Sequence, residues 1–355
     1  MTRKSPEAHG RNTIRDVAAR AQVSASTVSR VLAGDYPVST ATRTRVLRAV
    51  KDLDYVADAR ARAVAGAGTA TIAFVLDDIT GPSFAHMAQG VEREAAQRGH
   101  VCLVCTTEGD PERELAVVEL MRAQRAAAVI LVGGTVDTPE YRERMSRIAR
   151  ALQSAGSRLV LCGRPPLGDG TPATVIEYDN EGGAYAMTSH LLSMGHRRIL
   201  FLGGAGSTTA LGRERGYRSA HRAYGTEPDP ALLRPGDFTR DSGYRRVREA
   251  LAGGRRFTAV FAATDMVAAG ALTALHESGI HVPGEVSLAG YDDIPFARDL
   301  HPPLTTVHVP YEEMGRTAVR TVLGRRPDAG DEHRMLGTHV VLRASVRAAA
   351  LGVGA

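Results

Sequence analysis

The sequence predicts an α/β protein with an N-terminal helix-turn-helix headpiece, followed by a two-lobed core of doubly wound parallel sheets. Residues 13–53 hold three short amphipathic helix patterns. From residue 70 onward, short apolar strands alternate with helical stretches, which indicates parallel βαβ units. The length of 355 residues is enough for two or three domains.

We divide the chain by its changes of pattern. The expected parts are a flexible basic tail (1–12), the helix-turn-helix domain (13–56), a hinge helix or linker (57–69) and a ligand-binding core (70–355). Within the core we expect a first lobe of about 70–170 and 303–328, and a second of about 171–302 and 329–355. The linker favours a helix but is too short to be stable alone in water, so we expect DNA to support it.

The basic charge is concentrated at the N-terminal end. Residues 1–68 contain 12 Lys and Arg against 6 Asp and Glu, whereas the remainder contains 32 against 33. The formal net charge of +5 therefore comes from the first fifth of the chain. A basic module on a nearly neutral body is typical of proteins that bind a polyanion such as DNA.

Polar residues mark the start of each headpiece helix. Thr13 precedes the first apolar pattern, and Asp16 follows three residues later, so a reciprocal cap is possible. Ser24 can cap the second helix and Ser39 the third, with a break at residues 34–37 between them. The third helix is expected to bury four apolar side chains, namely Val46, Leu47, Val50 and Leu53.

The second helix has two unlike faces. Its apolar face carries Val28, Val31 and Leu32. On the other face, small side chains would let the helix enter the DNA major groove, where Arg30 could reach phosphate or guanine. The alternative is an ordinary three-helix surface module. We predict DNA contacts from Thr13, Ser24, Ala25, Ser26, Thr27, Ser29 and Arg30.

The cysteines and the apolar runs indicate a reduced, cytoplasmic protein. Cys102 and Cys105 have C-x-x-C spacing, but they belong to an apolar strand in which positions three apart face opposite ways. We expect them and Cys162 to be buried core residues instead of a redox or zinc site. Residues 1–11 are polar, and no apolar run is long enough for a membrane span, so neither an export signal nor membrane contact is expected.

The core elements can be assigned in order. For the first lobe, the predicted strands are 71–78, 101–107, 128–134 and 158–163, and the predicted helices are 83–99 and 114–126, with a further helix before 158. For the second lobe, the strands are 174–180, 197–204, 259–265 and 286–293, and the helices are 184–196, 213–225 and 267–279. Such sheets bind ligands beyond the carboxyl ends of their strands, so two facing lobes predict a cleft.

Several spaced motifs carry a resemblance to a known family. They are DVAARAQVSASTVSRVLAG and LDYVADARARAVA near the N-terminus, then DNEGG, GHRRI, RERGY, GDF, GYDD and PPLTTV in the core. Together they make the chain similar to the LacI/GalR family of bacterial transcription regulators. The resemblance implies that the core is similar to periplasmic binding proteins. It also implies a DNA-binding regulator, with a repressor as the leading expectation, controlled by a small-molecule effector such as a sugar.

The resemblance also implies a homodimer on a palindromic operator and a hinge helix in the minor groove. There Arg62 would lie near phosphates and Val64 would wedge between base pairs. This chain has Ala57-Asp58 where the family usually has Pro-Asn, and Val64 where Leu is common. The terminus leaves no room for the leucine-rich helix that joins some members into tetramers, so we expect a dimer.

Six effector-binding positions follow from the resemblance: Phe84, Arg164, Arg213, Phe238, Asp265 and Asp292. The two phenylalanines would flank a flat ligand, or alternatively pack in the core. Arg213 and Asp292 would bind polar groups, although Asp292 could instead cap a strand end. Gly163 and Thr264 replace an acidic residue and an Asn of the family pattern, which favours a ligand unlike its best-known sugars.

Two other classes of protein share this architecture. A transporter's solute-binding protein would need an export signal and would lack the headpiece. An enzyme would need a nucleophile, a base or a metal set, and the sequence presents no plausible catalytic constellation. His190 and His196 lie in and just after a helix pattern and are not expected to bind metal. No cofactor is expected, and whether the effector acts as inducer or corepressor, or the protein as activator, stays open.

Overall fold

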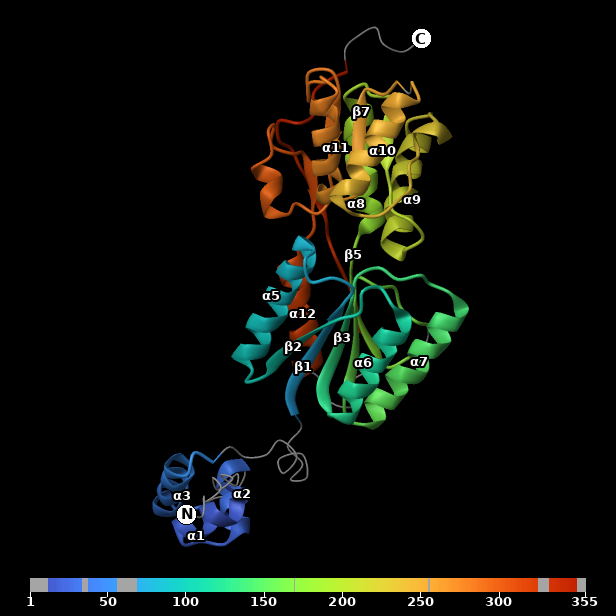
Figure 1. Cartoon of the computed structure of the whole chain (residues 1–355). Coiled ribbons are helices and arrows are strands. Elements are labelled where there is room, and N and C mark those ends of the chain that lie inside the picture. The colour runs from blue at the N-terminus through green and yellow to red at the C-terminus, as the bar shows by residue number, and fades with distance from the viewer. Residues whose placement is uncertain are drawn as a thin grey trace, which may run out of the picture. The chain divides into compact units, whose positions relative to one another are not determined.

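A computed structural model describes residues 12–33, 38–55, 69–168, 170–254, 256–324 and 332–349 (Figure 1). The chain divides into two compact units, Met1–Thr69 and Ala70–Ala355, which are treated separately below. The predicted hinge helix, with Arg62 and Val64, lies outside the described residues, as does the predicted tail up to residue 11. In the described part of the chain, no helix is long and apolar enough to cross a membrane.

The N-terminal unit contains the three predicted helices, α1 (Ile14–Ala21), α2 (Ala25–Ala33) and α3 (Thr40–Asp52). Asp16 accepts hydrogen bonds from the backbone N–H and the hydroxyl of Thr13, both at 2.7 Å. The Ser24 hydroxyl oxygen accepts from Thr27 N at 3.1 Å, and that of Ser39 accepts from Thr42 N at 3.3 Å. The predicted helix starts are confirmed, because these caps satisfy amide groups that a helix leaves unpaired.

A small apolar core joins the three helices. Val17, Val28 and Val46 are fully buried, one from each helix. Leu47 was expected inside, but half of its surface (50%) is exposed. Residue 47 lies one helical step of 100° beyond Val46, and Ala49 fills the inner face of α3 in its place.

The first lobe of the second unit is a six-stranded sheet in the order β10-β5-β4-β3-β1-β2. Its strands are β1 (Thr69–Leu76), β2 (Val101–Thr106), β3 (Ala126–Val132), β4 (Arg158–Cys162), β5 (Ala173–Tyr178) and β10 (Glu332–Leu336). Four helices cover it, namely α5 (Pro82–Gln97), α6 (Pro111–Ala123), α7 (Pro139–Ser154) and α12 (Tyr311–Gly324). Figure 1 shows α5 and α12 on one face and α6 and α7 on the other.

Alternation along the strands builds a core on each face of this sheet. Phe74 packs with Met87 of α5 and Met314 of α12. The next residue, Val75, packs with Met121 of α6 on the opposite face. Successive strand side chains point to opposite faces, so one buried strand supplies both cores.

The second lobe has a three-stranded parallel sheet in the order β6-β7-β8. Its strands are β6 (Ile199–Leu202), β7 (Ala259–Ala262) and β8 (Ser287–Ala289). Its helices are α8 (Asn180–Ser193), α9 (Thr208–Ala223), α10 (Arg240–Ala252) and α11 (Asp265–Glu277), with short 3-10 turns at Pro230–Leu232 and Pro295–Arg298. Strands β9 (Thr306–His308) and β11 (His339–Val341) form a separate antiparallel pair.

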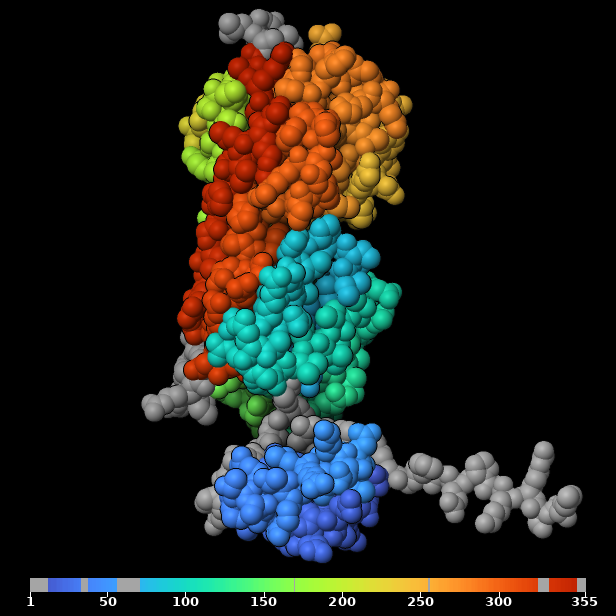
Figure 2. Space-filling model, turned by 90° about the vertical axis from the view of Figure 1, so that its left-hand side faces the viewer, coloured from blue at the N-terminus to red at the C-terminus, as the bar shows by residue number. Residues whose placement is uncertain are grey.

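The chain passes between the lobes at residues 178–180, 308–311 and 336–339. Figure 2 shows the C-terminal segments, coloured orange to red, running along both lobes. The first lobe extends beyond the boundary expected near residue 170, because β5 pairs with β4. It also takes in β10, expected in the second lobe, because β10 pairs in parallel with β5.

Strand β2 corrects the prediction that Cys102 and Cys105 are buried. Both thiols are half-buried, because β2 lies at the edge of the sheet. They face opposite sides, since Cys102 packs on the α5 core and Cys105 on the α6 core. Val101 on the same strand is 67% exposed. Cys162, on the interior strand β4, is buried as expected.

Candidate functional site

A cavity of about 410 Å³ lies between the two lobes, at the carboxyl ends of their strands. The first lobe contributes Asp77 and Asp78 after β1 and Phe84 from the first turn of α5. The second lobe contributes Arg213 from α9, and Asp292 after β8. The size is within the range of small-molecule sites, which is roughly 300–1,000 Å³.

Two phenylalanine rings line the cavity, one from each lobe. Phe84 stands beside Gly133, where an added Cβ would lie 3.2 Å from the ring. Phe238 stands beside Gly204, where an added Cβ would lie 2.4 Å from the ring. Glycines at these strand ends therefore leave room for both rings. Both predicted aromatic positions line the same space.

Arg213 is the centre of the polar wall. Its Nη2 lies 3.0 Å from Asp292 Oδ1, and it also donates to the Tyr178 hydroxyl at 3.1 Å. Its Nε donates to Asn180 Oδ1 at 3.0 Å. The guanidinium carbon stacks 3.7 Å from the centre of the Tyr291 ring. These contacts fix the orientation of a buried cation, which would be costly without them.

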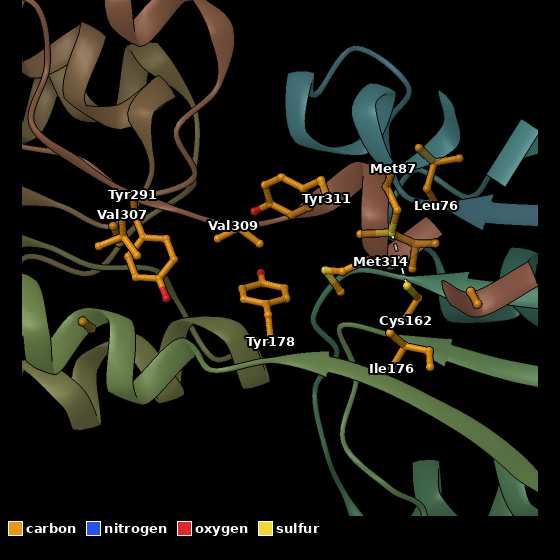
Figure 3. Close-up of a cluster of buried hydrophobic side chains, with 14 of the residues drawn as sticks. Leu76, Met87, Cys162, Ile176, Tyr178, Tyr291, Val307, Val309, Tyr311 and Met314 are labelled. Atoms are coloured by element: carbon orange, nitrogen blue, oxygen red, sulfur yellow. Dashed lines mark hydrogen bonds between the residues drawn. The ribbon is translucent and has the colours of Figure 1, made fainter. Parts of the chain in front are cut away.

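Two tyrosines complete this wall, and the sequence analysis did not identify them. Tyr311 donates to Asp292 Oδ1 at 2.8 Å, and its ring meets that of Tyr178 edge-on, with centroids 5.8 Å apart. Figure 3 shows the two rings pointing toward each other where the chain passes between the lobes. Each tyrosine lies at a lobe crossing, one at the end of β5 and the other at the start of α12.

The charge of the lining is predominantly negative. Four acidic residues line the cavity together with one arginine, namely Asp77, Asp78, Asp237 and Asp292 with Arg213. Burial raises the pKa of the Asp292 carboxyl, and the ion pair with Arg213 offsets part of that shift. Carboxylates accept hydrogen bonds from hydroxyl groups and repel phosphates. The lining is therefore suited to a ligand that is rich in hydroxyls and carries no negative charge.

Two predicted ligand residues lie outside the lining of this cavity. Arg164 donates to Glu114 at 2.7 Å, to the Tyr141 hydroxyl at 2.9 Å and to Gly133 O at 3.0 Å, so its position is fixed within the first lobe. Asp265 is fully buried and accepts from Ile294 N at 3.0 Å and from the Thr306 hydroxyl. This corrects the expectation that Asp265 faces the cleft, whereas Arg164 lines a neighbouring cavity that adjoins the first at Asp77, Gly134 and Ser207. The sequence pattern places both residues at the ends of strands, but it does not predict the direction in which their side chains point.

The predicted DNA-contacting residues that the structure describes lie just before α1 and at the start and along the length of α2. Ser24, Ser26 and Arg30 are exposed, and Thr13 is exposed just before α1. Thr27 and Ser29 are half-buried, as is Ala25, which packs against the apolar core. The Ser24 hydroxyl oxygen lies 2.8 Å from those of Ser26 and Thr27. The start of α2 thus presents small hydroxyl side chains that let another backbone approach closely.

The chain matches two known family models. Residues 13–58 match the model for bacterial regulatory proteins of the lacI family, and residues 188–346 match a periplasmic binding protein-like domain. The HTH-type transcriptional regulator CelR of Thermobifida fusca is 36% identical over 350 residues, covering 96% of this chain and 99% of CelR. The chain belongs to the lacI family of bacterial regulatory proteins.

Solved structures of the lacI family agree with this assignment. A complex of CelR with cellobiose has a TM-score of 0.68 and 34% identity, covering 94% of this chain and 100% of the other. A lac repressor dimer bound to operator and the anti-inducer ONPF has a TM-score of 0.79 and 26% identity, covering 96% and 100%. As a lacI-family member, this chain is a DNA-binding transcriptional regulator that responds to a small-molecule effector.

Proposed function

We propose that this regulator binds a neutral sugar in the cavity between the lobes, and that the sugar controls its affinity for a palindromic operator. Four predicted residues would hold the sugar: Phe84 and Phe238 against its ring, and Arg213 and Asp292 against its hydroxyls. The observation that carries the proposal is the combination of facing aromatic rings with a wall of carboxylates. Sugar rings have apolar faces and a polar rim, which this arrangement matches.

Operator contacts are assigned to the start of α2 and its flanks. Ser24, Ala25, Ser26, Thr27 and Ser29 would face base edges. Arg30 would reach a phosphate or a guanine, and Thr13 a phosphate. On the resemblance of their segment to family hinge helices, Arg62 is assigned to phosphates and Val64 to a wedge between base pairs in the minor groove.

The regulator is proposed to work as a homodimer in the cytoplasm, where its DNA lies, and to act by binding without chemical turnover. Two headpieces related by a twofold axis read an inverted repeat and gain affinity from being linked. The exposed apolar residues of edge strand β2, among them Val101 and Leu103, are available to contact a second copy. Light scattering of the intact protein measures its oligomeric state directly. A tetramer would contradict the proposed dimer.

One experiment tests the DNA and effector assignments together. The intact protein is used to select fragments from its source genome, and the enriched site is then titrated in the presence of a panel of sugars. We expect an inverted repeat and at least one sugar that changes its affinity. A decrease identifies an inducer and an increase a corepressor. Failure to enrich any inverted repeat, or a turnover product from the bound sugar, would contradict the proposal.

A further inference from the structure

One loop of the second lobe supplies four residues of the cavity lining. We call residues 234–239 the cavity loop, and its lining residues are Gly236, Asp237, Phe238 and Thr239. At its start, Arg234 N donates to Phe201 O of β6 at 2.9 Å. At its end, the Thr239 hydroxyl oxygen accepts from Ser242 N at 3.2 Å and caps α10. The middle of the loop contains neither helix nor strand, so these two anchors do not fix it.

Arg246, in the second turn of α10, is a buried arginine outside the cavity lining. Its side chain belongs to a residue that is only 4% exposed, and its four hydrogen-bond acceptors in the described part of the chain are backbone carbonyls. Burial lowers the pKa of the guanidinium to about 10, which leaves it charged near neutral pH. A buried cation is costly unless its donors are paired, so the carbonyls stabilise it in one orientation.

The carbonyls that Arg246 binds come from three segments of the chain. Nη1 donates to Gly203 O, just after β6, at 2.6 Å and to Arg234 O at 2.7 Å. Nη2 donates to Asp237 O at 3.1 Å, and Nε donates to Ser242 O at 3.1 Å within α10. One guanidinium therefore joins the end of β6, two points of the cavity loop and α10.

The cavity loop also packs closely on this guanidinium. A Cβ added at Gly236 would lie 3.2 Å from Cζ of Arg246, so the backbone passes directly over the planar group. Gly203, whose carbonyl accepts from Nη1, precedes Gly204, and a Cβ added at Gly204 would lie 2.4 Å from the Phe238 ring. Arg246 thus contacts both the loop that carries the ring and the segment that supports it.

We propose that Arg246 is a positioning residue for the effector site, because its guanidinium holds the middle of the cavity loop and thereby places Asp237 and the Phe238 ring at the cavity. Its consequence for binding rests on the proposed function, in which Phe238 contacts the sugar. Its effect on the loop can be measured without any sugar. Arg246→Lys keeps the charge but removes the planar set of donors, so one ammonium would have to serve carbonyls of three segments.

A fluorescent reporter separates this role from a contribution to stability alone. The chain contains no tryptophan, so Phe238→Trp makes the cavity loop the only source of tryptophan fluorescence. The cavity of about 410 Å³ beside the Phe238 ring leaves room for the larger side chain. In this background, Arg246→Lys is compared with Arg197→Lys as the matched control. Arg197 belongs to the same lobe, lies outside the lining and also donates to backbone carbonyls, those of Leu192 at 2.7 Å and His196 at 3.2 Å.

We expect Arg246→Lys to shift the tryptophan emission to longer wavelength and to increase its quenching by acrylamide, because a released loop exposes the ring to water. Arg197→Lys should change neither, and circular dichroism verifies that each variant is folded. Gly236→Ala is a second variant, which keeps the guanidinium and pushes the loop away from it, so it should shift the emission in the same direction. An unchanged emission in the folded variants would overturn the inference and leave the proposed function standing.

Calorimetry with glucose, maltose and cellobiose then measures the consequence for binding in the protein that keeps Phe238. For a sugar that binds, Arg246→Lys should lower the affinity at least about tenfold, and Arg197→Lys should leave it unchanged. In a Phe238→Ala background the loss caused by Arg246→Lys should be smaller, because the ring through which it acts is gone. Equal losses in both backgrounds would overturn the inference. A shifted emission without binding of any of these sugars would support the positioning role and count against the proposed function.

Discussion

The guanidinium of Arg213 lies 3.0 Å from the carboxylate of Asp292, and both side chains are almost completely buried. Burial alone would lower the pKa of Arg213, but Asp292 and the surrounding tyrosine hydroxyls raise it well above its ordinary value. The two side chains thus form a buried pair in the wall of the cavity. An effector that bonds to either partner joins a network that spans both lobes, through Tyr178 and Tyr311.

The planar guanidinium group of Arg213 gives the first prediction. Arg213→Lys keeps the charge but removes the planar donors that reach Asp292, Asn180 and Tyr178 together. We expect sugar affinity to fall at least about tenfold, with operator binding in the absence of sugar unchanged. Arg215→Lys on the same helix is the control, because Arg215 forms an exposed pair with Glu181. Calorimetry that gives wild-type affinity for Arg213→Lys would refute the assignment.

The aromatic wall gives a second prediction. Phe84→Ala removes the first-lobe ring that faces the cavity, and sugar affinity should fall by about tenfold, as expected for the loss of roughly 1.5 kcal/mol of ring contact. Ile79→Ala serves for comparison, since Ile79 is exposed and lies outside the lining. Equal affinities of the two variants would show that Phe84 serves only packing.

A negative charge added on the exposed side of α2 gives a third prediction. Ser26→Glu would put a carboxylate where DNA phosphates approach, so operator affinity should fall at least about tenfold. Ser26→Ala keeps a small side chain and should bind nearly as well as the wild type. Both variants should keep full sugar affinity. Fluorescence anisotropy with a labelled operator measures the difference, and equal binding by the two variants would place α2 away from the DNA.

The Asp293 carboxylate gives a prediction for the pH dependence of stability. Burial alone would raise its pKa, but hydrogen bonds from His308, at 3.0 Å, and from Arg343 hold it below the ordinary value. A lowered folded-state pKa stabilises the fold above the ordinary carboxyl range, and the contribution is lost as the pH falls through the folded-state pKa. Asp293→Asn should therefore cost about 2 kcal/mol near neutral pH and little in strong acid.

Thermal unfolding at pH 7 and at pH 2–3 checks the Asp293 prediction. Asp241→Asn is the control, since Asp241 is an exposed residue in the first turn of α10. At pH 7 its penalty should be clearly smaller than that of Asp293→Asn, because the Asp241 side chain is exposed. An Asp293→Asn penalty of the same size at both pH values would mean that packing, not the ionised carboxylate, explains the loss of stability.

Local chemistry made part of the fold predictable. Caps at Thr13, Ser24 and Ser39 depend on residues within one turn, so the sequence alone located the starts of the headpiece helices. The alternation of buried strands and helices can also be read from neighbouring residues, so the parallel sheets were predictable as well. Strand order is not local: Cys102 and Cys105 were expected to be buried, because nothing in VCLVC tells an edge strand from an interior one.

The candidate site was predictable to a lesser extent. Phe84, Arg213, Phe238 and Asp292 line one cavity, as the family resemblance implied. Arg164 sits at a strand end like the cavity residues, but a buried partner, Glu114, holds it inside the first lobe. Tyr178 and Tyr311 come from two different crossings of the chain, 133 residues apart in sequence. No local pattern brings them together, and only the tertiary structure shows their contact.

We expect a sugar bound between the lobes to control the affinity of the headpiece for DNA. The most direct test measures operator affinity of the intact protein with and without saturating sugar, for the wild type and for Arg213→Lys at the same sugar concentration. We expect at least a roughly fivefold shift for the wild type, the lower end of usual coupling energies, and a smaller one for the variant. A sugar that binds the wild type between the lobes but leaves operator affinity unchanged would contradict the account.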